Sequence, residues 1–257
     1  MPPSAVSLAT DPLLDAALQG RLWRGSSLGA QAAPTLPSGF AALDAELPGG
    51  GWPVQAVVEL LAPQFGVLEW RLLAPGLRAW WAAAPAGPGP LLLVNPPHTP
   101  HLPGLQALGL PPSALVWVSA ATPAQQLWAA EQAIKSRVAV LAWLPEARPE
   151  QLRRLQVGAL GSAAPAFLLR PEPARQQASA APLRLVVRPG DGGGLAVHLL
   201  KRRGPAHEGW LALPAAPAAL APLRAAAGGA APRPAPARPS RPSLERGDAL
   251  ARPVLPA

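Results

Sequence analysis

The segment with the clearest chemical pattern runs from a glycine-rich turn through a short apolar stretch into a loop. The glycines are Gly49–Gly51, the apolar stretch is "AVVELL" (residues 56–61), and the loop is "APQFGVLE" (residues 62–69), after which helical spacing begins. In the pattern G-x-x-x-x-G-K-[ST], a loop between a strand and a helix surrounds phosphates with backbone amides, the lysine neutralises them, and the hydroxyl holds Mg²⁺. The sequence therefore raises the question of a nucleotide site.

Laid on that pattern, the loop lacks the groups that bind phosphate. Ala62 stands at the position of the first glycine and Val67 at that of the second, while Leu68 replaces the lysine and Glu69 replaces the hydroxyl residue. An apolar side chain cannot neutralise a phosphate, and a carboxylate that faces a triphosphate repels it. A shifted alignment that uses Arg71 as the cation does not keep the spacing.

Two histidines, His98 and His101 in "PPHTPH", are close enough in sequence to be metal ligands or a pair of catalytic groups. No carboxylate or third histidine lies near them in sequence, and histidines in loops are commonly just solvated. The chain contains no cysteine, which excludes disulfides and thiolate metal sites. We therefore expect no metal site.

Nine tryptophans are many for a chain of 257 residues. Four of them fall on predicted helices: Trp70, Trp80, Trp81 and Trp128. One interpretation is packing within the core and at interfaces, where tryptophan is enriched. The other is a surface on which the bases of single-stranded DNA stack.

Two groups of basic residues are candidates for contact with nucleic acid or a partner protein. They are Lys201, Arg202 and Arg203 at the end of a predicted strand, and Arg233, Arg238 and Arg241 in the C-terminal segment. The net charge of +8 favours a nucleic-acid interpretation. However, nearly all of the positive charge is arginine, in excess together with alanine and proline, and a GC-rich coding sequence produces that composition for any function.

The elements that would position these residues alternate between strands and helices. Continuous apolar runs of strand length, such as "LLLV", are typical of parallel strands buried on both faces, and the segments between them have helical spacing. The expected strands are residues 56–61, 89–97, 114–120, 138–144 and 166–171, and the expected helices are residues 67–84, 102–109, 122–137 and 148–163. This alternation predicts an α/β fold with three layers, α/β/α, around a mostly parallel central sheet.

Prolines mark particular points in these helices. Pro75 lies inside the helix expected at 67–84 and should bend or interrupt it. Pro123 follows Thr122, which is a suitable N-cap for the helix at 122–137. A short helix over residues 40–47 should end at the proline and glycines that follow, and we expect those glycines to form a turn rather than to bind phosphate.

The two ends of the chain differ from this core. Residues 11–24 have helical spacing and would cover the chain's own core or pack on a neighbouring subunit. Residues 183–189 and 195–203 predict an antiparallel hairpin on the sheet edge, and the proline- and arginine-rich tail cannot bury enough apolar surface to become ordered. The expected organisation is an N-terminal helix and linker (1–33), the α/β domain (34–213) and a disordered tail (214–257).

The first 20 residues lack the basic start and the long apolar stretch of a signal peptide. No segment reaches the roughly 18 uninterrupted apolar residues that a spanning helix needs. We therefore expect a cytoplasmic protein that does not contact a membrane.

The order of the segments around the loop resembles the core of the RecA recombinase family. The resemblance extends over roughly residues 34–204, and its most specific points are Leu43, Asp44 and Gly49–Gly51 in "GFAALDAELPGGGWP". It implies that the strand at 138–144 corresponds to the one that carries the metal-binding acid in that family. A RecA-like fold is therefore the expectation.

A subfamily is a closer match, namely the ImuA-type RecA-like accessory proteins of bacterial mutagenic translesion synthesis. The segments "LWRG" (residues 22–25), "LPSGFAALDAELPGGGWP" (36–53) and "LLKRRG" (199–204) resemble its members in the same order, as does the proline- and arginine-rich tail. This resemblance implies a role in the SOS response to DNA damage. The implied partners are an ImuB-type Y-family-like polymerase protein and an error-prone replicative-type DNA polymerase, with RecA, DNA and a second copy as further candidates.

Within this resemblance, the residues needed for ATP chemistry are replaced. Ala142 stands where the family has its metal-binding aspartate, and Pro97 stands in the region of its acidic residues, which include the catalytic glutamate. Together with Leu68, these replacements imply a pseudo-ATPase that needs no cofactor and acts as a non-catalytic adaptor. Two alternatives remain: an ATP-dependent DNA-binding protein that holds ATP through backbone amides with Arg71 or Arg78, and a SulA-type cell-division inhibitor, which shares the degenerate fold.

Overall fold

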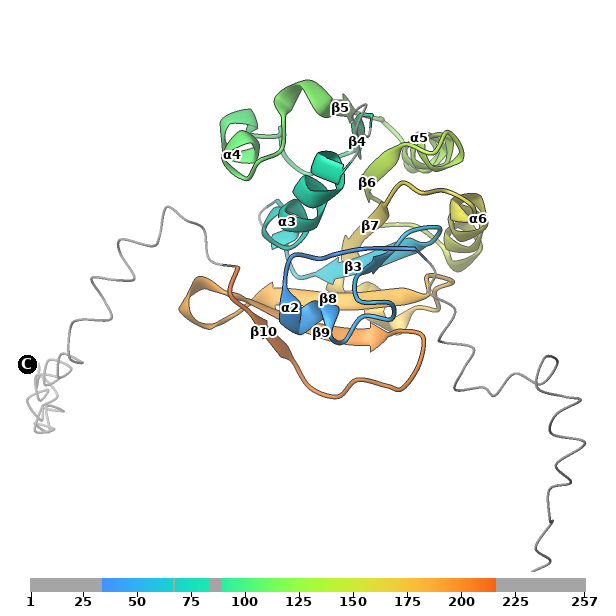
Figure 1. Ribbon diagram of the computed structural model, residues 1–257. Helices are drawn as coiled ribbons and strands as arrows, with labels where there is room; N and C mark the ends of the chain where they lie inside the picture. Colours follow the sequence, from blue (N-terminus) through green and yellow to red (C-terminus); the bar gives the residue numbers. More distant parts are fainter. Residues whose placement is uncertain (1–33, 67, 84–88, 216–257) are drawn as a thin grey trace, which may run out of the picture. The chain divides into compact units, whose positions relative to one another are not determined.

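The computed structural model describes residues 34–66, 68–83 and 89–215, which form an α/β arrangement of helices around a large sheet (Figure 1). The strands are β1 (Thr35–Leu36), β2 (Trp52–Pro53), β3 (Val57–Ala62), β4 (Leu91–Val94), β5 (Leu115–Val118), β6 (Ala139–Trp143), β7 (Ala166–Pro171), β8 (Leu183–Pro189), β9 (Leu195–Lys201) and β10 (Leu211–Leu213). The helices are α2 (Ala41–Asp44), α3 (Leu68–Ala83), α4 (Leu102–Ala107), α5 (Pro123–Lys135) and α6 (Pro149–Ala159), with the 3-10 helices η1 (Pro112–Ala114), η2 (Glu172–Gln176) and η3 (Asp191–Gly193).

The main sheet contains eight strands in the order β10-β9-β8-β3-β7-β6-β4-β5. All neighbours from β8 to β5 are parallel, whereas β9 is antiparallel to both β8 and β10. The expectation of a mostly parallel sheet with an antiparallel hairpin at one end is confirmed. The hairpin is not the outermost element, however, because the short strand β10 pairs with β9 and forms the edge.

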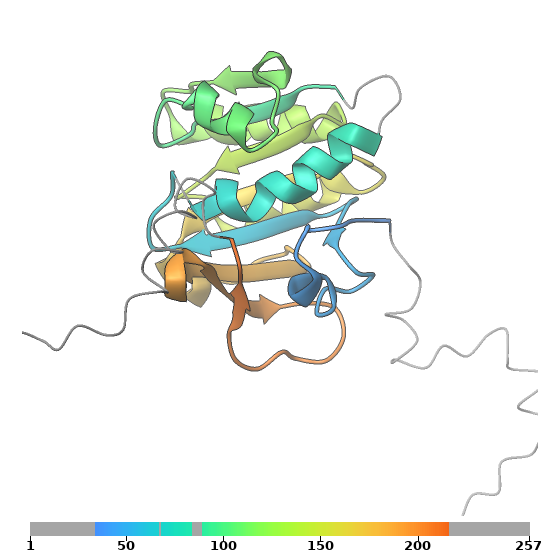
Figure 2. The ribbon, with the colours of Figure 1, turned by 60° about the vertical axis from the view of Figure 1, so that its left-hand side comes forward.

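Helices cover both faces of this sheet, with α3 and α4 on one side and α5 and α6 on the other (Figures 1 and 2). The residues of β3 alternate between the two apolar cores. Leu60 belongs to the core that includes Leu72 and Leu73 of α3, and Val57 belongs to the core that includes Ile134 of α5. Burial on both faces explains why β3 appears in the sequence as a continuous apolar run.

A local capping signal places the start of α5 as expected. The Thr122 hydroxyl accepts from the Gln125 amide (3.3 Å), and the Gln125 side chain accepts from the Thr122 amide (3.2 Å), which forms a capping box at the start of α5.

In α3, the helix continues through Pro75 rather than ending there. A Cβ at the next residue, Gly76, would lie 2.7 Å from the carbonyl oxygen of Pro37, so only glycine allows this close approach.

The glycine-rich segment before β3 forms a turn, as predicted from the sequence. Gly49 and Gly50 have φ angles of +82° and +77°, which favour glycine. A Cβ at Gly51 would lie 2.3 Å from the carbonyl oxygen of Leu36, where β1 and β2 form a two-stranded ribbon. These glycines are therefore required by the backbone path into β3.

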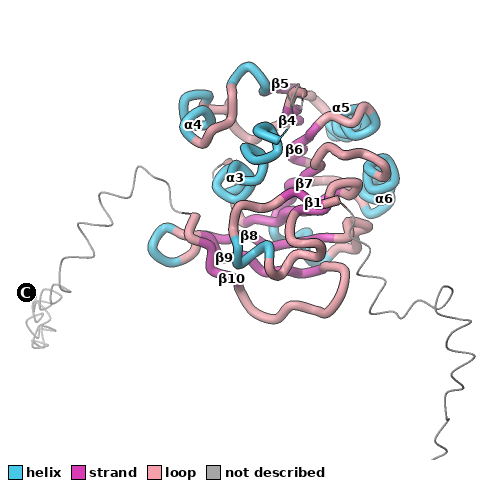
Figure 3. The backbone as a smooth tube through the Cα atoms, in the orientation of Figure 1, coloured by secondary structure: helices cyan, strands magenta, loops and turns pink. Residues whose placement is uncertain are grey.

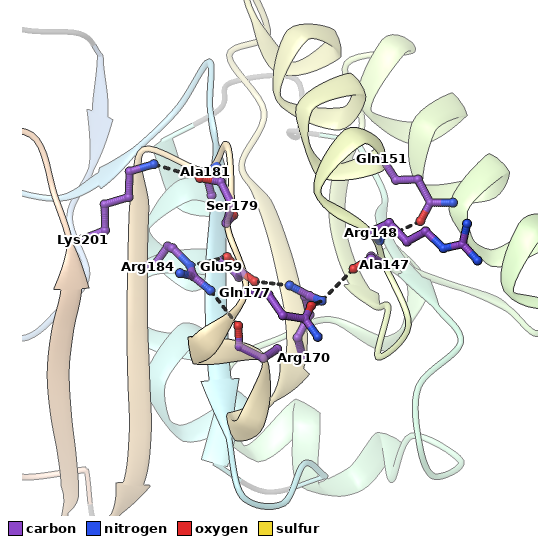
Figure 4. Close-up of polar contacts among 11 residues, drawn as sticks. Glu59, Ala147, Arg148, Gln151, Arg170, Gln177, Ser179, Ala181, Arg184 and Lys201 are labelled. Carbon is purple, nitrogen blue, oxygen red and sulfur yellow. Dashed lines mark hydrogen bonds and ion pairs between the residues drawn. The ribbon is translucent and has the colours of Figure 1, made fainter.

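A buried carboxylate links three strands of the sheet. Glu59 on β3 accepts hydrogen bonds from Arg170 Nη1 on β7 (2.7 Å) and Arg184 Nε on β8 (2.6 Å), with its two oxygens each facing one guanidinium group (Figure 4). Glu59 and Arg170 are fully buried and Arg184 nearly so. Charges at this depth are stable only when they are paired and hydrogen-bonded.

The two guanidinium groups have further partners on the same face of the sheet. Arg170 Nη2 donates to the carbonyl oxygen of Ala147 and to the side-chain oxygen of Gln177, both at 2.6 Å. Arg184 Nη2 donates to the carbonyl oxygen of Ala174 at 3.0 Å (Figure 4). The network thus joins β3, β7 and β8 to η2 and to the loop before α6.

The predicted N-terminal helix (11–24) and the tail from residue 216 onward lie outside the described residues. Among the helices that the structure does describe, none has the length and apolar character required to cross a membrane.

Candidate functional site

The loop that follows β3 leads directly into α3, the arrangement in which a phosphate loop would lie. Here the helix begins at Leu68, and the second residue of the helix, Glu69, turns its side chain back toward the loop. The Gly66 amide donates to Oε1 of Glu69 at 2.7 Å. The Gly66 amide, two residues before the start of the helix, is therefore bound to the protein's own carboxylate.

A second donor reaches the same oxygen from the neighbouring part of the sheet. The indole N–H of Trp143, the last residue of β6, donates to Glu69 Oε1 at 3.3 Å. The Trp143 ring also packs against Trp70, with ring centroids 6.2 Å apart. Trp143 directly follows Ala142, the residue that stands at the position of the family's metal-binding acid, and its indole is a neutral N–H donor.

Glu69 is almost completely buried, with 2% of its surface exposed, and this burial raises the pKa of its carboxyl group above the ordinary value. The hydrogen bonds from Gly66 and Trp143 and the nearby His98 ring act in the opposite direction on the pKa, but burial is the largest cause. The second oxygen, Oε2, is buried without a hydrogen-bond partner among the described residues.

His98, which follows β4, closes the loop from another side. A Cβ at Gly66 would lie 2.7 Å from Cδ2 of the His98 ring, and Gly66 itself has a φ of +115°. The loop therefore packs against the β4–α4 connection and requires a glycine at residue 66.

These contacts define what the site can do chemically. The N-terminus of a helix favours negative charge and attracts phosphates, and here a carboxylate that belongs to the helix itself occupies that environment. An incoming phosphate would meet Glu69 instead of a lysine. The arrangement stabilises the start of α3 and disfavours a second anion.

Arg71, the cation that an unconventional nucleotide site would use, instead donates hydrogen bonds to backbone carbonyls of another part of the fold. Its Nε donates to the carbonyl oxygen of Ala215 (2.7 Å), and its Nη2 donates to the carbonyl oxygens of Gly194 (3.0 Å) and Gly193. Arg71 thereby connects α3 to the β8–β9 turn and to the segment after β10. The other proposed cation, Arg78, is exposed near Gly109.

Of the other positions singled out from the sequence, three are buried and one is exposed. Ala62 ends β3 and is buried, as is Leu68, which belongs to the core on the α3 face. Ala142 is fully buried within β6, and Pro97 is exposed after β4. Val67 lies outside the described residues.

The two candidate histidines have separate roles. His101 is the N-cap of α4, where its Nδ1 accepts from the Gly104 amide at 3.2 Å, whereas His98 faces Gly66. Within the described residues, no group of three or more His, Cys, Asp or Glu side chains could hold a metal ion.

The tryptophans that we singled out divide into two groups. Trp70 is buried, and Trp80 and Trp81 are half-buried with ring centroids 5.6 Å apart, which supports packing roles. Trp128 on α5 is 63% exposed. Of these four tryptophans, it is therefore the only one whose side chain is exposed enough to contact a ligand or partner.

Two of the three basic residues at the end of β9 form contacts with other parts of the same fold. Lys201 donates to the carbonyl oxygen of Ser179 (2.9 Å; Figure 4), and Arg202 forms an ion pair with Glu46 (2.8 Å). Arg203 is exposed. Outside the described residues lie Arg233, Arg238 and Arg241.

Sequence reasoning missed Trp143, which contacts Glu69 at this loop, and Glu59, which is the centre of the buried ion-pair network. A single carboxylate within "VVELL" was a signal for Glu59, because an isolated charge in an apolar strand needs a partner. The contact between Trp143 and Glu69 had no such signal, since 74 residues separate them.

A comparison of the chain with protein-family models and with curated proteins gave no match.

Proposed function

We propose that this chain is a RecA-like domain without nucleotide chemistry, which acts as a non-catalytic adaptor in damage-induced mutagenic translesion synthesis. The observation that carries the proposal is the loop after β3, where the Glu69 carboxylate accepts from the Gly66 amide in place of a phosphate. The placement of this loop after an inner strand of a mostly parallel sheet supports the RecA-like part of the proposal.

The alternative of an ATP-dependent protein is less well supported by the same geometry. An ATP-dependent function needs Arg71 as a phosphate ligand, but the guanidinium group of Arg71 donates to three backbone carbonyls. It also needs an unfilled loop, whereas Glu69 is buried there. We therefore favour a binding role over an ATP-driven one.

In this role, the domain would bring other proteins together without a nucleotide switch. From the resemblance to ImuA-type proteins, the partners would be an ImuB-type Y-family-like protein and an error-prone replicative-type polymerase, with RecA and DNA as further candidates. Segments rich in proline and arginine can become ordered on binding, which suits transient assemblies. We assign docking to the tail arginines, which are Arg233, Arg238 and Arg241, together with the exposed Arg203.

Co-purification of the full-length chain with an ImuB-type protein from the same genome tests this proposal. We expect a complex that weakens when Arg233, Arg238 and Arg241 are replaced together by alanine. The matched control replaces three exposed arginines of the folded part, Arg137, Arg148 and Arg153, and should leave the complex intact. Failure to form any complex contradicts the adaptor role, and an equal loss with both triple variants contradicts the assignment to the tail.

A further inference from the structure

One continuous part of this chain contains no charged side chain. Charged residues make up 14% of the sequence, yet residues 79–130 include no Asp, Glu, Lys or Arg. This stretch supplies the end of α3, all of β4, α4 and β5, and the first half of α5. These elements lie together around the β5 end of the sheet (Figure 3).

Large apolar side chains are exposed at this end. Val116 and Trp117 of β5 are 43% and 49% exposed, and Leu102 at the start of α4 is 45% exposed. Their neighbours Leu115 and Val118 pack against the cores on opposite faces of the sheet. Because side chains alternate along a strand, Trp117 lies on the face of Leu115 and Val116 on the face of Val118.

The backbone of β5 is open on one side. β5 pairs with β4, and it is the last strand in the order of the sheet, so no strand of the described residues pairs with its other side. An edge strand with free N–H and C=O groups is a template for pairing with another extended segment. Exposed apolar side chains and the absence of charge at an edge increase that tendency.

The opposite edge of the sheet is built differently. The segment that leads into β10 carries Arg202, Arg203 and Glu208, and charges near an edge strand discourage pairing with another chain. Among the described parts of the sheet, only the β5 edge therefore combines an open backbone, exposed apolar side chains on the edge strand, and a place within a stretch of sequence that has no charged residue.

From these observations we infer that the β5 edge is a self-association surface, on which β5 of a second copy pairs antiparallel about a two-fold axis. A two-fold interface brings the same surface patch of both copies together. Residues 79–130 suit that arrangement because an uncharged surface meets itself without like-charge repulsion. The pairing would extend the sheet across both copies and bury Val116 and Trp117, and it is independent of the function proposed above.

Sedimentation of the full-length protein over a range of concentrations tests this inference. We expect a reversible monomer–dimer equilibrium that Val116→Lys weakens about 100-fold or more, because two lysines would face each other across the new strand pair. The matched control is Val157→Lys, which places the same charge on an apolar residue of α6 that is 61% exposed and should leave the equilibrium unchanged. A wild-type protein that stays monomeric throughout, or a Val116→Lys variant that dimerises like wild type, overturns the inference.

A charge-swap experiment separates lost pairing from lost folding. Val116→Lys and Val116→Glu should each be monomeric alone, and an equimolar mixture of the two should form a heterodimer. Misfolded variants would not recover on mixing, so a mixture that stays monomeric while both variants keep the wild-type circular dichroism and thermal midpoint counts against the two-fold pairing.

Discussion

Glu59 on β3 and Glu69 at the start of α3 are both buried, but the protein holds their charges in different ways. Glu59 accepts from two guanidinium groups at 2.7 and 2.6 Å. Glu69 accepts from a backbone amide and an indole N–H, and one of its oxygens has no partner among the described residues. The first carboxylate neutralises buried cations, and the second fills a loop.

This difference separates a buried network that maintains the fold from a local contact that fills the loop after β3. The network around Glu59 joins three central strands to η2, so its loss would leave two arginines buried without a counter-charge. The contacts of Glu69 are local to the loop and the start of α3, and its charge is disfavoured by burial. We expect substitutions at the two positions to differ in size and in dependence on pH.

The largest effect is expected for Glu59→Ala. Removal of one partner from a buried ion pair leaves an uncompensated charge and costs roughly 3–5 kcal/mol, and here two arginines lose their shared partner. Urea unfolding at pH 7 measures the change. A loss below about 1 kcal/mol would show that the network contributes no more than a surface pair.

Gly66→Ala should have the next largest effect. The φ of +115° at Gly66 is strained for any residue with a Cβ, at about 1–3 kcal/mol. His98 is exposed and its ring can turn away, so His98→Ala should rescue little of the loss. If the double variant recovers the wild-type midpoint in urea, the contact with His98 and not the backbone conformation is the cause.

Glu69→Gln should change stability in a way that depends on pH. Burial raises the pKa of Glu69 in the folded protein, so the wild type loses stability as the pH rises from the unfolded-state pKa of about 4.3 through the higher folded-state pKa. The glutamine variant lacks this titration, so its stability should rise relative to that of the wild type over this pH range. Urea midpoints of both proteins between pH 4 and 8 give the comparison, and parallel curves would contradict it.

The smallest effect is expected for Glu172→Gln, which serves as the surface counterpart of Glu59. Glu172 pairs with Arg188, whose side chain is 46% exposed, so the loss should be about 0–1 kcal/mol. The hydrogen bond from Arg188 lowers the pKa of Glu172. Its small contribution is therefore present above the unfolded-state pKa and is lost as the pH falls through the lower folded-state value.

The regular elements of the domain could be predicted from the sequence because they carry strong local signals. The apolar run at β3 and the Thr122–Pro123 start of α5 are such signals, and both were confirmed. The two-residue strands β1 and β2 and the three-residue strand β10 were missed, because strands this short show no periodicity.

The candidate site could be predicted only in part. Leu68 and Glu69 indicated from the sequence that the loop has no lysine or hydroxyl residue at the positions where a phosphate loop carries them. The sequence suggested a carboxylate that faces outward to repel a phosphate, whereas the structure turns Glu69 inward to the Gly66 amide. The commitment of Arg71 to carbonyls more than 120 residues away depends on the tertiary fold, and no local pattern reveals it.

Calorimetric titration of the full-length protein with Mg-ATP tests the central claim most directly. If Glu69 fills the loop and no lysine is present, neither the wild type nor the Glu69→Gln variant should show saturable binding, because removal of the carboxylate does not supply the missing cation. Saturable binding at micromolar ATP that disappears in Arg71→Ala would contradict the claim and identify a working nucleotide site.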